Sequence, residues 1–411
     1  MRLWVLFACW VITSLIVPTA EAHDKSISYS DWSISDDDTI SVRIRVPARI
    51  TTLLLKNRLN AEAYDVAAAY LQNQLSLRQG DAVCEAVGKP RRLSGAPDTL
   101  VLELRYRCPS PSPQDLILRN NAFFPLAAGH VHFIRSVHVS DGSLHEAVLT
   151  AGAREAFVFP STDEERRLDN DWALFGVGVY HILGGADHLV FVLGLLLIAK
   201  PGRDLFLAIT GFTLGHSLSL AAAVTGFVSA DSGPVEALIA LTIWLLGALA
   251  LRKHFASENR ILMITSAGLL LSAFLASFVA TGSVNIAFWV GISVLTLAYL
   301  SVSPQAHTGA QPISLLLTAS LGLTHGFGFA GGLQEAFAST SSLAMSLIAF
   351  NLGVEAGQLI FIGFLLACAF IIRRLPLTEQ LQVPTLRMAG VLVAAAGALW
   401  FTERAILAPV L

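Results

Sequence analysis

The chain has 411 residues, of which 54% are hydrophobic and 14% are charged, and its formal net charge is −3 at pH 7. Soluble proteins carry about 25% charged residues, so this composition argues against a wholly soluble protein. The net charge and the lack of a basic patch argue against nucleic-acid binding. Charged residues are dense before Asp171 and sparse after it, which predicts a soluble N-terminal part and a membrane C-terminal part.

Residues 1–22 have the pattern of a signal peptide. Arg2 supplies the positive start, Leu3 to Val17 the apolar core, and Ala20-Glu21-Ala22 a small-x-small cleavage site. Cleavage would leave His23 as the mature N-terminus, whereas the alternative is an uncleaved anchor. Either way the next domain is exported, where an oxidising compartment would allow Cys84 and Cys108 to form a disulfide.

Residues 23–170 form a predicted periplasmic domain that is mostly β. Apolar and polar residues alternate from Thr39 to Val46 and from Thr99 to Cys108, as in half-buried strands. The Ala-, Leu- and Gln-rich stretch Asn60–Leu77 predicts one helix. We expect a small β-sandwich, with further strands at Asp115–Arg119, His130–Val139, Leu144–Thr150 and Glu155–Phe159.

Three histidines of this domain are secondary metal-ligand candidates. His130 and His132 flank Val131, so in a strand they would share one face. The alternative places them on a solvated polar face. His23, as a free N-terminus, would chelate an ion through its α-amino group and its imidazole, unless its position is due to chance.

Residues 171–411 form a predicted transmembrane helical domain. A span needs about 20 apolar residues, and the sequence predicts about eight spans, with seven as the alternative. Lys and Arg gather in alternate loops, which predicts that the C-terminus lies outside; Arg404 is the exception. The predicted spans are about 172–199, 205–228, 234–251, 261–280, 285–302, 313–335, 343–372 and 387–408.

Two stretches of this domain repeat. Leu214–Ala221 reads LGHSLSLA and Leu323–Ala330 reads LTHGFGFA, and each precedes a span that contains Val-Glu-Ala. The paired spans run in the same direction in the predicted topology, which indicates two four-span halves related by an axis along the membrane normal. The alternative is coincidence between Gly- and Ala-rich helices.

Ionisable residues inside the predicted spans suggest metal chemistry, because each costs roughly 2.5–3.5 kcal/mol at bilayer depth. Any one histidine could instead be a packing residue. Imidazole and carboxylate ligands suit nickel, cobalt or zinc, whereas Cu(I) favours sulfur and calcium or magnesium favours oxygen. The principal candidates are His181, Asp187, His188, His216, His325 and Glu355, and the secondary ones are Glu236, Asn351 and Gln358.

The spacing of His181 and His188 predicts an irregular helix. They are seven residues apart, so on a straight helix their Cα atoms would lie roughly 10 Å apart along the axis, too far to share one ion easily. Either the helix is broken at Gly184-Gly185, or the two histidines serve successive positions along a path. We expect the break, since broken helices form sites in transporters.

The His181-x5-Asp187-His188 pattern resembles the H-x5-D-H motif of the HupE/UreJ family of hydrogenase and urease accessory membrane proteins, above all its longer branch with an exported domain. The resemblance extends through GHSLSLA, VEALIAL, THGFGFAGG and NLGVEAGQ, and touches AHDKSISYSDW. It implies uptake of nickel, cobalt or a related metal, with these three residues essential and His325 in a second motif. That motif, FHG-x-[AV]-x-G-x-E in short members, is matched incompletely: Thr324 replaces its Phe and the nearest Glu is Glu335. Glu355 is therefore the better carboxylate candidate.

We accordingly predict a secondary transporter or facilitator, a permease for divalent nickel or cobalt in the bacterial inner membrane, and not an enzyme. No permanent cofactor is expected. The expected partners are the transported ion, the lipid bilayer and a metal supplier on the periplasmic or outer-membrane side. The alternative function is an intramembrane zinc hydrolase in which histidines hold the metal.

Overall fold

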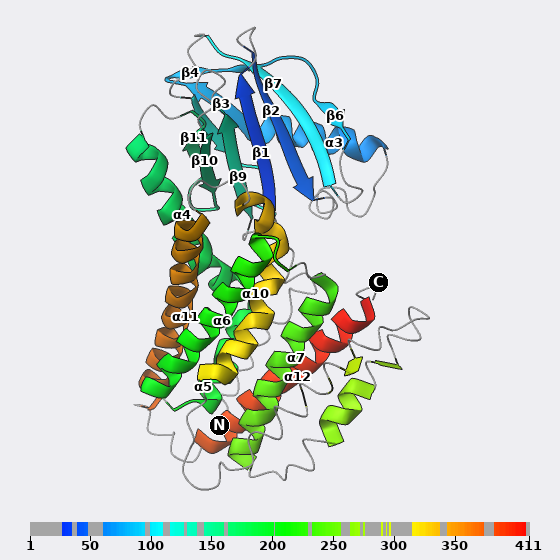
Figure 1. Ribbon diagram of the computed structural model, residues 1–411, viewed down its shortest axis with the longest axis vertical. Helices are drawn as coiled ribbons and strands as arrows, with labels where there is room; N and C mark the ends of the chain where they lie inside the picture. The colour runs from blue at the N-terminus through cyan, green and yellow to red at the C-terminus, as the bar shows by residue number, and fades with distance from the viewer. Residues whose placement is uncertain are drawn as a thin grey trace. The chain divides into compact units, whose positions relative to one another are not determined.

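Figure 1 shows a computed structural model of the chain. It describes residues 27–34, 39–47, 61–94, 99–109, 116–126, 130–137, 144–159, 163–200, 202–228, 232–255, 264–271, 274–275, 289–290, 293, 296, 315–337, 343–373 and 382–407. The chain divides into two compact units, which we call the β unit (His23–Gly184 and Ala336–Gly353) and the helical unit (Gly185–Glu335 and Val354–Leu411). The proposed signal peptide and His23 lie outside the described residues.

The β unit contains two sheets that share one hydrophobic core. The seven-stranded sheet has the order β10-β9-β1-β2-β7-β5, with β6 also paired to β7, and the four-stranded sheet has the order β11-β8-β3-β4. Side chains from both sheets and from α3 (Ala61–Gln74) meet in this core, which confirms the predicted β-rich N-terminal domain. The strands are β1 (Ile27–Ile34), β2 (Thr39–Pro47), β3 (Leu75–Gln79), β4 (Ala82–Val83), β5 (Glu85–Ala86), β6 (Arg91–Leu93), β7 (Thr99–Arg107), β8 (Leu116–Asn120), β9 (Val131–Val137), β10 (Leu144–Leu149) and β11 (Glu155–Phe157).

β1 lies in the middle of the larger sheet, between β2 and β9. It pairs antiparallel with β2 and parallel with β9, as the three neighbouring arrows in Figure 1 show. Its buried face carries Ser28 and Ser30 before Trp32, so the strand lacks the apolar alternation that marks β2 and β7. That polar face is why sequence analysis did not identify the strand.

A row of alternating charges crosses the exposed face of the larger sheet. Each member sits directly opposite a residue of the other sign on the next strand, an arrangement that stabilises neighbouring strands. Because the charges in this row neutralise one another, its acidic and basic residues are explained without a bound ligand. Its members are Glu146, Arg135, Asp31, Arg43, Glu103 and Arg91, from β10 to β6.

Cys84 and Cys108 form the predicted disulfide. Cys84 lies between β4 and β5, and Cys108 directly follows β7. The bridge therefore ties the connection between β4 and β5 to the end of β7. Cys368, the free cysteine among the described residues, lies in α11.

The described helices support a membrane protein, but they do not confirm the predicted number of spans. Four are long and apolar enough to cross a membrane, or up to five if a broken pair counts as one span, so the expected count of about eight is not confirmed. The predicted spans 261–280 and 285–302 lie largely outside the described residues. The helices are α4 (Asp163–Gly184), α5 (Ala186–Ile198), α6 (Arg203–Val224), α7 (Ser232–Phe255), α10 (Leu315–Phe337), α11 (Leu343–Arg373) and α12 (Gln382–Leu407).

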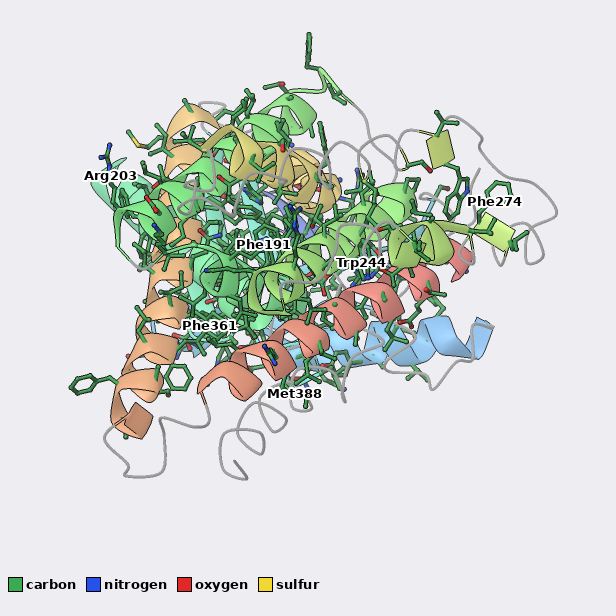
Figure 2. All side chains as sticks on the ribbon, turned by 90° about the horizontal axis from the view of Figure 1, so that it is seen from below. Phe191, Arg203, Trp244, Phe274, Phe361 and Met388 are labelled. Carbon is green, nitrogen blue, oxygen red and sulfur yellow. A yellow bond between two sulfur atoms is a disulfide. The ribbon has the colours of Figure 1, made fainter. Side chains whose placement is uncertain are left out.

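The core of the helical unit forms where α5, α7 and α12 pack together. Figure 1 shows α7 and α12 side by side, and their glycines permit this contact: a Cβ on Gly397 would overlap the backbone of Trp244, and one on Gly247 the backbone of Ala394. Phe191 and Trp244, labelled in Figure 2, belong to this core. The principal candidate metal ligands of this unit lie on α5, α6, α10 and α11.

Candidate metal site

The helix that carries His181 and His188 is broken, as predicted. α4 ends at Gly184 and α5 begins at Ala186, and Gly185 between them has an extended backbone with φ −94° and ψ 106°. The break puts Asp187 in the first turn of α5, where the helix dipole favours a negative charge. His181 belongs to the β unit, in which its ring lies 5.7 Å from that of Phe350, whereas Asp187 and His188 belong to the helical unit.

Asp187 is paired with Arg404. Its Oδ2 lies 2.8 Å from Nη1 of Arg404, and the two side chains are 0% and 13% exposed. Arg404 also donates a hydrogen bond to the backbone carbonyl of Glu236 and lies over the Trp400 ring. The basic residue that broke the orientation pattern in the sequence is therefore a buried counter-ion and not a loop charge.

His188 faces His325 of α10, whereas its neighbour Asp187 pairs with Arg404. The two imidazole rings are 5.5 Å apart in an edge-on arrangement. The His325 ring also packs against Phe191 at 4.6 Å and against Phe212 at 5.0 Å, all distances being between ring centroids. An aromatic, largely apolar surrounding thus holds two candidate ligands from different helices side by side.

A hydrogen bond assigns the protons of His325. Thr242 Oγ1 lies 2.7 Å from the carbonyl oxygen of Ile239 and 3.0 Å from His325 Nε2. A hydroxyl has one proton, which must go to the carbonyl because a carbonyl only accepts. Oγ1 therefore accepts from the Nε2–H of His325, and a neutral His325 carries its lone pair on Nδ1, the nitrogen suited to a metal ion.

His216 reaches the same region because α6 and α10 approach closely. A Cβ on Gly215 would overlap the backbone of Ala319, and one on Gly322 the backbone of Phe212. Such small-xxx-small contacts are a common way for membrane helices to pack. The His216 ring stacks on Phe212 at 6.1 Å, so His216 and His325 both contact Phe212, while His188 contacts His325.

The two repeated motifs are therefore packed against each other. Gly215 and His216 belong to LGHSLSLA in α6, and His325 and Gly326 belong to LTHGFGFA in α10. A Cβ on Gly326 would overlap both the Ser219 hydroxyl and the carbonyl of His216. Gly211 and Gly322, one turn before each motif's central glycine, complete the contact.

Two polar residues of α11, Glu355 and Gln358, form hydrogen bonds with α6 rather than with the imidazoles. Thr210 donates a hydrogen bond of 2.8 Å to Glu355, and Thr213 donates one of 3.2 Å to Gln358. Glu355 and Gln358 thus share one helix face. Asn351, which belongs to the β unit, donates to the carbonyl of Leu347 within its own helix.

The six principal candidates do not converge on one point. Within the described parts of the chain, no three His, Cys, Asp or Glu side chains are placed to hold one metal ion. The reason is local: Asp187 is turned to Arg404, Glu355 to Thr210, His188 and His325 to each other, and His216 to Phe212. Glu236 is half-buried and contributes its backbone carbonyl to Arg404.

His130 and His132 are buried, at 1% exposure each, and do not lie on the solvated face that one interpretation expected. Both contact the Ser28 hydroxyl, which confirms that they share a face. The second nitrogen of His132 is bonded to Ser30, which also accepts from the indole of Trp32. In this arrangement His132 belongs to a hydrogen-bond network, and burial lowers its pKa to about 3.

Sequence reasoning missed four polar partners of the candidate residues: Thr210, Thr213, Thr242 and Arg404. Only Arg404 gave a signal, as the basic residue on the wrong side of the predicted membrane. The threonines are common in helices of this composition and gave none.

Comparison with known proteins yields one match. A family model described as "HupE / UreJ protein" matches residues 162–283 and 266–404, which together cover more than half of the chain and all six principal candidates. No curated protein and no solved structure matches the chain.

Proposed function

Because the chain belongs to the HupE/UreJ family, we propose that it is a secondary transporter or facilitator that takes up a divalent transition metal ion, nickel or cobalt, across the bacterial inner membrane. The proposal places the β unit's sheets in the periplasm, where they would capture or gate the metal. The six principal candidates, His181, Asp187, His188, His216, His325 and Glu355, would interact with the ion along its path.

One observation carries this proposal: contacts link imidazoles from three helices, because His188 lies against His325, and His325 and His216 both lie against Phe212. Polar and ionisable residues at this depth in a membrane protein commonly mark ion pathways. Imidazole is a ligand of borderline metals such as nickel, cobalt and zinc. Thr242 holds His325 in the tautomer in which Nδ1 has the lone pair, as outer hydrogen-bond partners do for metal-binding histidines.

A membrane potential would drive such uptake without ATP. A dication moving to a negative interior gains roughly 4.6 kcal/mol per 100 mV, twice the value for a single charge. A site for transport must also release its ion, so ligands spread over several helices suit it better than one tight cage does.

Metal flux into proteoliposomes tests the proposal. The purified full chain would be reconstituted, a negative interior imposed with a potassium gradient, and Ni²⁺, Co²⁺, Zn²⁺, Fe²⁺ and Cu⁺ offered in turn. We expect saturable entry of Ni²⁺ or Co²⁺. His188→Ala and His325→Ala should each lower it about tenfold or more, the size typical of losing a metal-site contact.

The matched control is Leu218→Ala, which lies on the same helix as His216 with its side chain 65% exposed and should leave the flux unchanged. His181→Ala tests the contribution of the β unit separately. Wild-type rates in folded His188→Ala and His325→Ala proteins would contradict the proposal.

The rival function is an intramembrane zinc hydrolase, and metal retention separates the two. An enzyme keeps its zinc through detergent purification and a chelator wash, since catalysis needs a resident ion. A transporter site should exchange its ion with the buffer and support flux. Stoichiometric zinc after washing, with no flux of any metal tested, would favour the enzyme.

A further inference from the structure

We infer that Arg404 is the resident counter-ion of Asp187 and that it competes with the transported metal ion for this carboxylate. The inference rests on the proposed function, because it adds to metal transport the step by which the carboxylate becomes available. It starts from the buried pair between Arg404 Nη1 and Asp187 Oδ2 at 2.8 Å.

The pair satisfies a charge that could not otherwise be buried there. Asp187 is 0% exposed and sits in a helix bundle, where an uncompensated carboxylate is strongly destabilising. An ionised Asp187 therefore needs a cation beside it throughout the cycle. Arg404 supplies it in the arrangement seen, and a divalent metal ion bound by the neighbouring imidazoles would supply it in another.

The two cations exclude each other. A guanidinium and a divalent ion on one carboxylate would repel at close range in a low dielectric. Asp187 is adjacent to His188 in the chain, and His188 faces His325. A metal ion held by these imidazoles that drew Asp187 toward itself would therefore separate the carboxylate from Arg404.

Arg404 has other partners that remain when Asp187 leaves. It donates a hydrogen bond of 3.2 Å to the Glu236 carbonyl, and its guanidinium lies 5.7 Å from the centre of the Trp400 ring. Carbonyl and aromatic contacts both stabilise a guanidinium. On the side of Asp187, Gly185 with its extended backbone precedes the first turn of α5, so the carboxylate sits next to a break and not inside a continuous helix.

Competition of this kind affects both the binding and the release of the ion. Arg404 lowers the affinity for the ion, and by the same coupling it promotes release by recapturing Asp187. Removing the guanidinium should therefore tighten binding and slow turnover. Replacing a residue with a purely structural role would change only the stability of the protein.

The test measures metal affinity and flux in Arg404→Gln. Ni²⁺ and Co²⁺ binding to the full chain in detergent would be measured by calorimetry and by the metal-induced rise in melting temperature. We expect affinity to rise about tenfold, within the range typical of coupling between two sites. In proteoliposomes both the half-saturating concentration and the maximal rate should fall. Arg203→Gln, which removes an exposed arginine from the start of α6, is the control and should match the wild type.

Chemical rescue makes the test specific. In Arg404→Ala, millimolar guanidinium chloride should occupy the space of the lost side chain and return the metal affinity toward the wild-type value, whereas sodium chloride at the same ionic strength should not. If Arg404→Gln does not fold, Arg404→Lys is used instead. Lysine keeps the positive charge but loses the planar guanidinium, so it should hold Asp187 less firmly and the metal affinity should rise about threefold.

The outcomes separate the two proposals. A wild-type protein with neither metal-dependent stabilisation nor flux refutes the proposed function, and this inference with it. A wild type that binds and transports metal, beside folded Arg404 variants with unchanged or weaker affinity and no effect of guanidinium, refutes the competition alone.

Discussion

Thr242 Oγ1 lies 3.0 Å from Nε2 of His325 and fixes which nitrogen of that imidazole donates. Replacing Thr242 with Val keeps the shape of the side chain but removes the acceptor. We expect metal affinity to fall about tenfold, the lower end of the range for outer hydrogen-bond partners of metal-binding histidines. Calorimetry with Ni²⁺ or Co²⁺ measures it. Thr242→Ser retains the hydroxyl and should bind as the wild type does; equal binding by the Val and Ser variants would contradict the assignment.

Gly322 of α10 packs against the carbonyl of Phe212 in α6, and Gly322→Ala should destabilise the helical unit. The added methyl overlaps backbone atoms, which cannot change rotamer, so the expected loss is about 1–3 kcal/mol, as in other overpacked cores. Thermal unfolding in detergent measures the change. Gly363→Ala in α11 is the control, since a Cβ there meets nothing within 4 Å. A Gly322→Ala protein as stable as this control would show that the two helices do not make the contact.

The β unit should lose stability as the pH falls. Burial lowers the pKa of His132 to about 3, while in the unfolded chain it is about 6.5. Between these values the unfolded state binds a proton that the folded state does not, so stability is present above pH 6.5 and decreases toward pH 3. The expected slope is about 1.4 kcal/mol per pH unit.

Pulse proteolysis of the full chain between pH 7 and pH 5 measures this dependence. His132→Gln keeps a polar side chain but does not titrate, so it should be less stable at pH 7 and show a shallower slope. Parallel curves for the two proteins would rule out His132 as the source.

Removing the disulfide should destabilise the same domain. Cys84 and Cys108 are separated by 24 residues, and the loss of a cross-link over such a loop costs roughly 3 kcal/mol. The double variant Cys84→Ala/Cys108→Ala is compared with Cys368→Ala, which removes the free cysteine of α11. Proteolysis of the β unit should accelerate in the first variant only. Equal rates in both would mean that the bridge does not contribute to stability.

The strands that the sequence predicted are those with an apolar inward face. Ile40, Val42, Ile44 and Val46 alternate with polar residues, and β2 follows within one residue of the expected bounds. β1 was missed because its inward Ser28 and Ser30 look like a solvated face. They are buried because His130 and His132 of a distant part of the chain arrive as their partners. Only the fold reveals such a pairing.

In the helical unit, local features were predictable and contacts between helices were not. Gly184-Gly185 and the spacing of His181 and His188 were enough to predict the break at Gly185. The repeat of LGHSLSLA and LTHGFGFA was visible in the sequence, but not that the two copies meet. The ion pair of Asp187 and Arg404 joins α5 to α12, and no periodicity relates residues so far apart.

The contact between α6 and α10 makes the spacing of two candidate metal ligands depend on the size of the residues at the contact glycines. Each central glycine faces backbone atoms, so a larger residue cannot be relieved by trimming one opposing side chain and must push the two helices apart. His216 and His325 would move with them, because each histidine is the direct neighbour of one of these glycines. Glycine-to-alanine and glycine-to-serine changes at Gly215 or Gly326 are therefore a graded way to push α6 and α10 apart and to widen the spacing of the two imidazoles.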